Sequence, residues 1–160
     1  LLENPLAEDE FQQLSDRKEV YFREGVRGNT RLLPGAGDWL ERFSAAGLKQ
    51  AVASSAPMEN IDVHLDELNI RCYFAEAVSG ENLPGKPDPA VFKRAAELLG
   101  VSPADCLVIE DAVPGVEAAK RAGMRCVAVL TTNPAGKLQC ADLIVPDLTH
   151  LTFEKLVGLK

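Results

Sequence analysis

The chain has 160 residues, of which 46% are hydrophobic and 26% charged, a balance typical of a soluble globular domain and not of a disordered or collagen-like chain. Asp and Glu number 24 against 17 Lys and Arg, and the net charge of −7 argues against a surface that tracks nucleic-acid phosphates or an anionic membrane. The longest apolar runs are far below the roughly 20 residues that span a bilayer, so no membrane partner is expected.

The first third of the chain predicts two helices. Apolar residues at helical spacing indicate a helix over residues 8–24, which Gly25 ends. A second helix over residues 36–46 carries its apolar side chains on one side and ends at Gly47, a natural left-handed C-cap. Gly and Pro between the two helices indicate a linker.

From residue 48 onward, short apolar strands alternate with amphipathic helices. The predicted strands cover residues 48–54, 76–79, 106–109, 125–130 and 141–145, and the predicted helices cover a segment opened by Pro57, residues 89–99 and 114–122, and a short stretch near 151–159. This alternation predicts an α/β fold with a parallel sheet covered by helices on both faces, because parallel crossovers are helical and right-handed. Ligands bind such sheets outside the carboxyl ends of the strands, so the chemistry is expected there.

The cysteines and histidines indicate no site of their own. The four cysteines are Cys72, Cys106, Cys126 and Cys140. None belongs to a Cys-x-x-Cys pair, which favours free thiols in a reducing cytoplasm over disulfides or zinc ligands. The two histidines have no nucleophile or acid close in the sequence, which argues against a Ser/His/Asp hydrolase.

Two serines end the first predicted strand. Ser54 and Ser55 stand just before the helix opened by Pro57. A hydroxyl beside the free N–H groups of a helix N-terminus suits a phosphate oxygen. Either serine could instead cap that helix, and the two roles are compatible for different serines.

A lysine follows the second predicted strand. Lys86 is held extended by the proline after it, which places a cation at the same edge of the sheet as Ser54. It could stabilise the charge of a transferring phosphoryl group, or it could be a solvated surface lysine. Asp88 and Pro89, by contrast, are explained by helix initiation alone.

Two adjacent acids, Glu110 and Asp111, end the third predicted strand. Carboxylates at the end of a buried strand repel each other and lose water, so they are costly unless a cation or hydrogen-bond donors satisfy them. Mg²⁺ suits such oxygen ligands and takes one or two carboxylates. Asp111 could alternatively cap the following helix.

Three segments, in this order and spacing, resemble a known family. They are VASS at 52–55, GKPDPAVF at 85–92 and VIEDAVPGVEAAKRAG at 108–123. They resemble the second, third and fourth motifs of the haloacid dehalogenase-like superfamily, in the branch of β-phosphoglucomutases and small phosphatases with a helical cap. The resemblance implies a Rossmann-like core and Mg²⁺-dependent phosphoryl transfer to and from a small phosphorylated metabolite, through an aspartyl-phosphate.

The resemblance also implies roles for single residues. Ser54, with Ser55 beside it, would bind the transferring phosphate, Lys86 would bridge phosphate and nucleophile, and Asp111 with Glu110 would hold magnesium. The stretch DRKEVYF at 16–22 is similar to the last long cap helix, in which Lys18 would face the substrate. Residues 1–30 would then be the end of a helical cap and residues 31–160 a core that lacks its first strand.

One departure from the family is serious. The first motif, an Asp-x-Asp that supplies the nucleophile and the general acid/base, occurs nowhere in this sequence. Together with a first residue that is Leu1, its absence predicts a missing N-terminal piece and a nearly inactive chain. By the family's topology the lost strand lies in the middle of the sheet, which would leave two strands with unpaired edges. We expect a swapped dimer, association with the missing segment, or a sheet that closes up differently.

Three other functions stay open. A β-phosphoglucomutase-like phosphomutase would need a second phosphate-binding group in the cap. A 2-haloacid dehalogenase works without metal and has no use for paired acids at 110 and 111. A non-catalytic module that binds metal and phosphate is favoured by the missing nucleophile.

Overall fold

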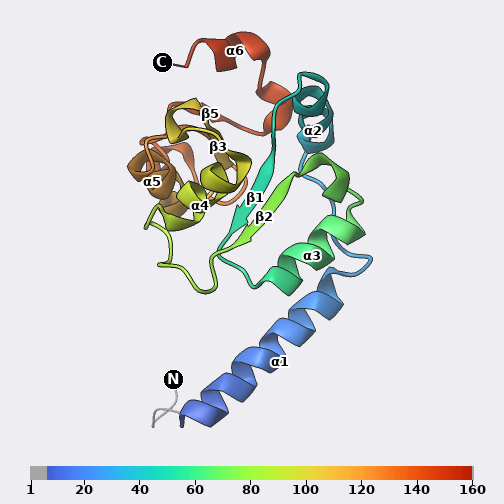
Figure 1. Ribbon diagram of the computed structural model, residues 1–160. Coiled ribbons are helices and arrows are strands. Elements are labelled where there is room, and N and C mark those ends of the chain that lie inside the picture. Colours follow the sequence, from blue (N-terminus) through green and yellow to red (C-terminus); the bar gives the residue numbers. More distant parts are fainter. Residues whose placement is uncertain (1–6, 160) are drawn as a thin grey trace.

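The fold alternates helices and strands along the chain, as predicted (Figure 1). A computed structural model describes residues 7–159. The helices are α1 (Glu8–Val26), α2 (Ala36–Ala45), α3 (Met58–Glu67), α4 (Ala90–Leu99), α5 (Val113–Arg121) and α6 (Phe153–Val157). The strands are β1 (Ala51–Ser54), β2 (Glu76–Ser79), β3 (Leu107–Glu110), β4 (Arg125–Val129) and β5 (Leu143–Val145), and the short 3₁₀ turn η4 spans Leu148–His150. The first strand begins three residues later than predicted. Leu48 is not part of the strand, because its backbone N–H donates to the carbonyl of Phe43 at the end of α2, at 2.9 Å.

The strands form two parallel sheets. β1 pairs with β2, from Ala51 opposite Glu76 to Ser54 opposite Ser79. β4 lies between β3 and β5 in the second sheet. Among residues 7–159 no strand joins β1 to β3, so β1 and β3 are each at the edge of a sheet, as expected for a core that lacks the strand in the middle. The architecture is the predicted α/β fold with parallel strands and helices on both sides.

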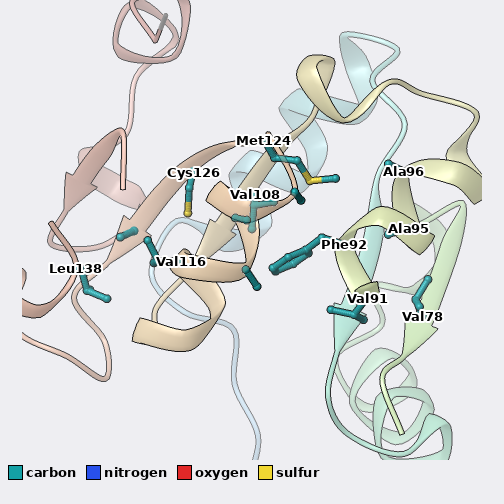
Figure 2. Packing of buried hydrophobic residues seen from close by; sticks show 14 residues of the cluster. Val78, Val91, Phe92, Ala95, Ala96, Val108, Val116, Met124, Cys126 and Leu138 are labelled. Carbon is teal, nitrogen blue, oxygen red and sulfur yellow. The ribbon is translucent and has the colours of Figure 1, made fainter. Parts of the chain in front are cut away.

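One hydrophobic core joins the two sheets (Figure 2). Helix α4 packs on β1 and β2, and its Phe92 belongs to the same buried cluster as Val108 of β3 and Cys126 of β4. Helix α5 packs on β3 and β4 through small residues, of which Ala118 and Ala119 are completely buried. The side chains of α4 and α5 thus connect sheets that share no backbone hydrogen bond.

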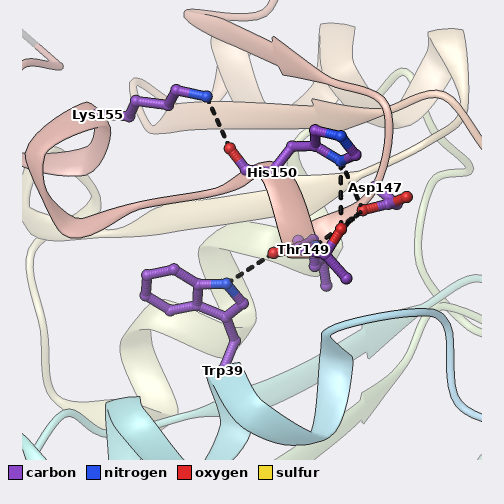
Figure 3. Close-up of polar contacts among 6 residues, drawn as sticks. Trp39, Asp147, Thr149, His150 and Lys155 are labelled. Atoms are coloured by element: carbon purple, nitrogen blue, oxygen red, sulfur yellow. Dashed lines mark hydrogen bonds and ion pairs between the residues drawn. The ribbon is translucent and has the colours of Figure 1, made fainter.

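A second buried cluster attaches the C-terminal segment to α2. The indole N–H of Trp39 donates to the carbonyl of Leu148 at 2.9 Å, in a buried position (Figure 3). Gly35, just before α2, has a φ of +81°, and a Cβ there would lie 2.6 Å from the backbone of Leu148. Only glycine permits this close approach, which explains why the linker before α2 carries glycine at this position.

Helix α1 projects from the rest of the molecule and contacts α3 (Figure 1). Its apolar side chains are largely exposed: Phe11, Leu14, Val20, Tyr21 and Phe22. The junction with α3 is polar, because buried Asn60 donates to Glu19 of α1 and accepts from the guanidinium of Arg23 at 3.0 Å. No helix within residues 7–159 is long and apolar enough to cross a membrane.

Candidate phosphate and metal site

The carboxyl ends of β1 and β3 meet at Lys86. Its ammonium group donates to Glu110 Oε1 at 2.6 Å and lies 3.5 Å from the carbonyl oxygen of Ala53. The side chains of Lys86 and Glu110 are only 14% and 11% exposed, so this ion pair is largely desolvated. The alternative of a solvated surface lysine is therefore wrong. Lys86 lies where the topological argument predicts a ligand.

An aromatic ring supports the same ammonium group. Lys86 Nζ lies 4.5 Å from the centre of the Phe92 ring, within the range of a cation–π contact. Phe92 belongs to α4, the helix that follows the Lys86 loop. A carboxylate, a carbonyl and an aromatic face thus hold the Lys86 ammonium group in place. An ammonium group has three N–H donors, so one remains for a ligand after the bonds to Glu110 and Ala53.

Glu110 has no free carboxylate oxygen. Its Oε1 accepts from Lys86, and its Oε2 accepts from the backbone N–H groups of Asp111 and Ala112 at 2.8 and 2.9 Å. A Cβ at Gly115 would lie 2.0 Å from Oε1, so only glycine leaves room for the carboxylate. Glu110 therefore orients Lys86 in this arrangement, and its predicted role as a direct magnesium ligand stays a prediction.

Asp111 is held by polar residues that follow β4. Its Oδ2 accepts from the hydroxyls of Thr131, at 2.9 Å, and Thr132, and its backbone carbonyl accepts from Asn133 Nδ2 at 3.1 Å. Helix α5 has Ala112 as its N-cap, with no side-chain cap bond. The alternative that Asp111 caps this helix is therefore wrong.

The threonines are site residues that the sequence-based prediction missed. The run Thr131, Thr132 and Asn133 directly follows β4, which neighbours β3 in the sheet. Polar residues at the carboxyl end of a further parallel strand are the signal that could have identified them.

The serines at the end of β1 do not cap α3. The N-cap of α3 is Pro57, without a side-chain cap bond. Ser54 Oγ accepts from the N–H of Ala56 at 3.2 Å, which leaves its own O–H available as a donor, and Ser55 is exposed. Ser54 ends the strand β1 and directly follows Ala53, whose carbonyl oxygen lies 3.5 Å from the Lys86 ammonium group.

Lys18 is not in contact with these groups. Its ammonium group pairs with Glu19 on α1, where its side chain is 70% exposed. The Lys18 ammonium and the Asn60 amide lower the pKa of the Glu19 carboxyl. The predicted role of Lys18 toward substrate stays a prediction.

Asp111 is the one candidate ligand for Mg²⁺ with a free carboxylate oxygen among the residues that end β3. No group of three or more His, Cys, Asp or Glu that could hold a metal occurs among residues 7–159. Asp111 Oδ1 has no hydrogen-bond partner within the same range, while the threonines hold Oδ2. Mg²⁺ is commonly held by one or two carboxylates, with water and substrate phosphate completing its shell. Asp111 fits this pattern as a single protein ligand.

The site combines a clamped lysine, a serine hydroxyl and a free carboxylate oxygen at the carboxyl edge of a parallel α/β fold, where ligands bind in such folds. The profile of a hydrolase family, haloacid dehalogenase-like hydrolase, matches residues 2–123. The chain therefore belongs to the haloacid dehalogenase-like hydrolase family.

Relatives in this family include a mutase and a phosphatase. The chain is 39% identical over 150 residues to β-phosphoglucomutase of Bacillus subtilis, covering 92% of this chain and 64% of that protein. It is 31% identical over 151 residues to the chloroplastic 5-amino-6-(5-phospho-D-ribitylamino)uracil phosphatase of Arabidopsis thaliana, covering 94% of this chain and 40% of that protein. The predicted cytoplasmic location stays a prediction, because one relative is a chloroplast protein.

A solved structure shows the same fold. The β-phosphoglucomutase of Clostridium difficile superposes with a TM-score of 0.84 at 28% identity, covering 95% of this chain and 67% of that one. The chain spans less than two thirds of the length of the curated relatives named above.

Proposed function

We propose that this chain forms the phosphate- and magnesium-binding part of a phosphatase that acts on a small phosphorylated metabolite. The observation that carries the proposal is the part-buried Lys86–Glu110 pair at the carboxyl ends of β1, which ends at Ser54, and β3, which Asp111 follows. In this role the Ser54 hydroxyl donates to one phosphate oxygen. Lys86 directs its remaining N–H at another, because Glu110 and Ala53 already orient the ammonium group.

Magnesium would be held by Asp111 through Oδ1, with Thr131 and Thr132 fixing the carboxylate plane. When bound, the ion neutralises charge on the phosphate oxygens. Glu110 holds the Lys86 ammonium group in position through their hydrogen bond. These residues act on the phosphate, and none of them is a free nucleophile.

By family resemblance, the nucleophile is an aspartate outside these 160 residues. Its carboxylate oxygen attacks phosphorus while the bond to the leaving alkoxide breaks, and water then hydrolyses the aspartyl-phosphate. Removing a nucleophile from a covalent mechanism costs roughly 10⁴- to 10⁶-fold in rate, so the 160-residue chain is expected to be nearly inactive.

An assay with p-nitrophenyl phosphate and Mg²⁺ tests the covalent mechanism. Turnover by the 160-residue chain near that of a typical phosphatase would contradict it.

A binding experiment tests the role of Ser54 toward phosphate. Inorganic phosphate with Mg²⁺ is titrated calorimetrically into the wild-type chain, Ser54→Ala and Ser55→Ala. A hydrogen bond to a charged group is worth about 1.5–3 kcal/mol, so Ser54→Ala should weaken binding at least about tenfold while Ser55→Ala changes it little.

The threonines provide a test of the metal role. Thr132→Val keeps the shape of the side chain and removes a hydrogen bond to Asp111. Loss of such a supporting bond typically lowers metal affinity about 10- to 100-fold. Thr149→Val is a matched control, because Thr149 bonds Asp147 at η4 and not Asp111. Equal Mg²⁺ affinity in all three proteins would contradict the assignment of Asp111.

Two other functions have an observation in their favour. A phosphomutase is supported by the 39% identity to the Bacillus enzyme of that name. A non-catalytic module is supported by the absence of Asp-x-Asp from all 160 residues. Transfer of phosphate between two positions of one sugar by the full-length natural protein would identify the mutase, and Mg²⁺-dependent phosphate binding without turnover by that protein would identify the module.

A further inference from the structure

The end of β2 supports the turn that carries Ser54. In the parallel pair of β1 and β2, Ser54 stands opposite Ser79, so the last residues of the two strands are neighbours. The backbone N–H of Gly80, the residue after β2, donates to the carbonyl of Ser54 at 2.7 Å. A Cβ at Gly80 would lie 3.2 Å from that carbonyl oxygen and 3.2 Å from the Cα of Ser55, so a larger residue would push the turn away.

The hydroxyl of Ser79 bonds the same turn. It donates to the carbonyl of Ala56 at 2.7 Å, and its oxygen accepts from the backbone N–H of Glu81 at 3.2 Å. A serine hydroxyl has a single proton to donate, and the bond to Ala56 uses it. Ser79 therefore offers no donor to a phosphate oxygen, although it ends a strand at the carboxyl edge of the sheet.

Ala56 links Ser79 to Ser54. Its N–H donates to Ser54 Oγ at 3.2 Å, and its carbonyl accepts from Ser79. The first turn of α3 does not use this carbonyl, because the N–H of Asn60 donates to the carbonyl of Pro57 instead, at 3.1 Å. In the part of the chain that the structure describes, Ser79 is thus the hydrogen-bond partner that fixes the Ala56 carbonyl.

These two hydrogen bonds in series determine where the Ser54 proton can point. The Ser54 oxygen accepts the N–H of Ala56, so its own O–H is directed away from that N–H. At 3.2 Å this bond is at the long end of the N–H···O range, and it orients the hydroxyl only while Ala56 itself is held. The side chain of Ser79, 23 residues away from Ala56 in the sequence, supplies that restraint.

We propose that Ser79 is a positioning residue, whose hydroxyl fixes Ala56 so that Ala56 orients the Ser54 hydroxyl toward a ligand oxygen. The inference rests on the proposed function, in which the ligand is phosphate. Ser79 does not bind the phosphate itself, because its proton is already used. Its contribution is preorganisation, since the Ser54 hydroxyl is ordered before the ligand binds.

Calorimetric titration of inorganic phosphate with Mg²⁺ into the 160-residue chain tests the proposal. Ser79→Ala removes the hydroxyl and should weaken phosphate binding about fivefold, because a neutral hydrogen bond is worth about two- to twelvefold in an equilibrium constant. Ser79→Thr keeps the hydroxyl and should bind within about twofold of wild type. Ser102→Ala is the matched control, because Ser102 is exposed and makes no side-chain cap bond.

A double-mutant cycle separates a positioning role from a direct one. If Ser79 acts through Ser54, adding Ser79→Ala to Ser54→Ala should weaken phosphate binding no further, within about twofold. A further loss of about fivefold in the double variant would show that Ser79 acts independently of Ser54 and would overturn the proposal. Wild-type affinity in Ser79→Ala, or the same loss in Ser79→Thr as in Ser79→Ala, would also overturn it.

Amide hydrogen exchange of the ligand-free chain, followed by NMR, distinguishes failure of this inference from failure of the proposed function. Ser79→Ala should accelerate exchange of the Ala56 amide at least about threefold, whereas Ser79→Thr and Ser102→Ala should not. Wild-type rates for the β4 amides show that each variant is folded.

The two experiments together give a decision in every case. Unchanged exchange of Ala56 in Ser79→Ala would overturn the inference. If phosphate binds to none of the proteins while Ala56 responds as expected, the positioning of the Ser54 hydroxyl by Ser79 is supported, and only the proposed phosphate-binding function is rejected.

Discussion

At the scale of single residues, the Lys86–Glu110 pair is the costliest feature of the site. Two opposite charges with little exposure lose their hydration. Their mutual attraction offsets this desolvation cost only while both charges are present and hydrogen-bonded. Glu110 meets that condition with three donors, of which two are backbone N–H groups at the start of α5. The pair therefore contributes position more than stability, and its partners depend strongly on each other.

We predict that Glu110→Gln lowers the free energy of unfolding by about 3 kcal/mol, because it leaves the buried Lys86 ammonium without a counter-charge. Urea denaturation measures the change. The control is Glu97→Gln, which breaks the exposed pair with Arg94 and should cost less than about 1 kcal/mol. Similar losses in the two variants would show that the Lys86–Glu110 pair is solvated.

A second residue-scale prediction concerns pH. Hydrogen bonds from Thr149 and then His150 lower the pKa of Asp147 from 3.8 to about 2 (Figure 3). Because the folded pKa lies below the unfolded one, this carboxylate stabilises the fold above about pH 4, and the contribution is lost as the pH falls from about 4 to about 2. Denaturation of wild type and Asp147→Asn should therefore differ above pH 4, and the difference should shrink below it. A constant difference across this range would contradict the assignment.

At the scale of elements, α1 is attached to the rest of the molecule through a few polar contacts. Its large apolar side chains are exposed, whereas Asn60 of α3 is 4% exposed and bonds both Glu19 and Arg23. A buried amide that loses its partners costs about 1–3 kcal/mol. Asn60 is thus the buried polar contact between α1 and α3, beside the ring contact of Phe22 with His64 at 5.5 Å.

We expect Asn60→Ala to release α1 while the sheets stay folded. Hydrogen exchange of the α1 amides should accelerate at least about tenfold, a change of about 1.4 kcal/mol in local opening, and that of the β4 amides should not. Asn29→Ala is the control, because its side chain bonds only carbonyls of its own turn. Unchanged exchange in α1 would show that other contacts hold this helix.

At the scale of the whole molecule, side chains and not backbone pairing connect the two sheets. Phe92 is central to this connection, since it is 6% exposed, belongs to the cluster shared by the strands of both sheets, and faces Lys86. Trp39 lies in the other cluster, with β4 and β5, and is the only tryptophan. Its fluorescence therefore reports on one part of the molecule, whereas circular dichroism reports on all of it.

Phe92→Ala should lower the free energy of unfolding by about 3–5 kcal/mol and should separate the urea transitions seen by Trp39 fluorescence and by circular dichroism. Coincident transitions are the mark of two-state unfolding. Phe153→Ala is the control, because the ring of Phe153 is 44% exposed and lies against Trp39 at the C-terminal end. Coincident transitions in Phe92→Ala would show that the sheets are coupled without this ring.

Much of the fold was predictable because it depends on local pattern. Apolar runs and helical spacing identified the helices and strands to within about three residues, and the positions of Ser54, Lys86, Glu110 and Asp111 after strands identified the edge that carries the chemistry. The missing Asp-x-Asp also predicted unpaired strand edges, and β1 and β3 each have one among the described residues.

The different partners of the two adjacent acids in the site were not predictable. Glu110 and Asp111 are adjacent in sequence and looked equivalent, yet one binds Lys86 and the other binds two threonines. Which partner each acid finds depends on loops that are 20 or more residues away along the chain. Short motifs carry no information about such neighbours.

The sequence by itself therefore determined the order and kind of the elements, the family and the residues at the carboxyl edge, because hydrophobic periodicity and strand-end polarity are local properties. Only the tertiary structure decided that side chains of α4 and α5 connect the two sheets, that Lys86 bridges β1 and β3, and that Glu110 and Asp111 have different partners. These features arise from segments distant in the chain that pack side by side, and their energies come from desolvation and backbone pairing across space.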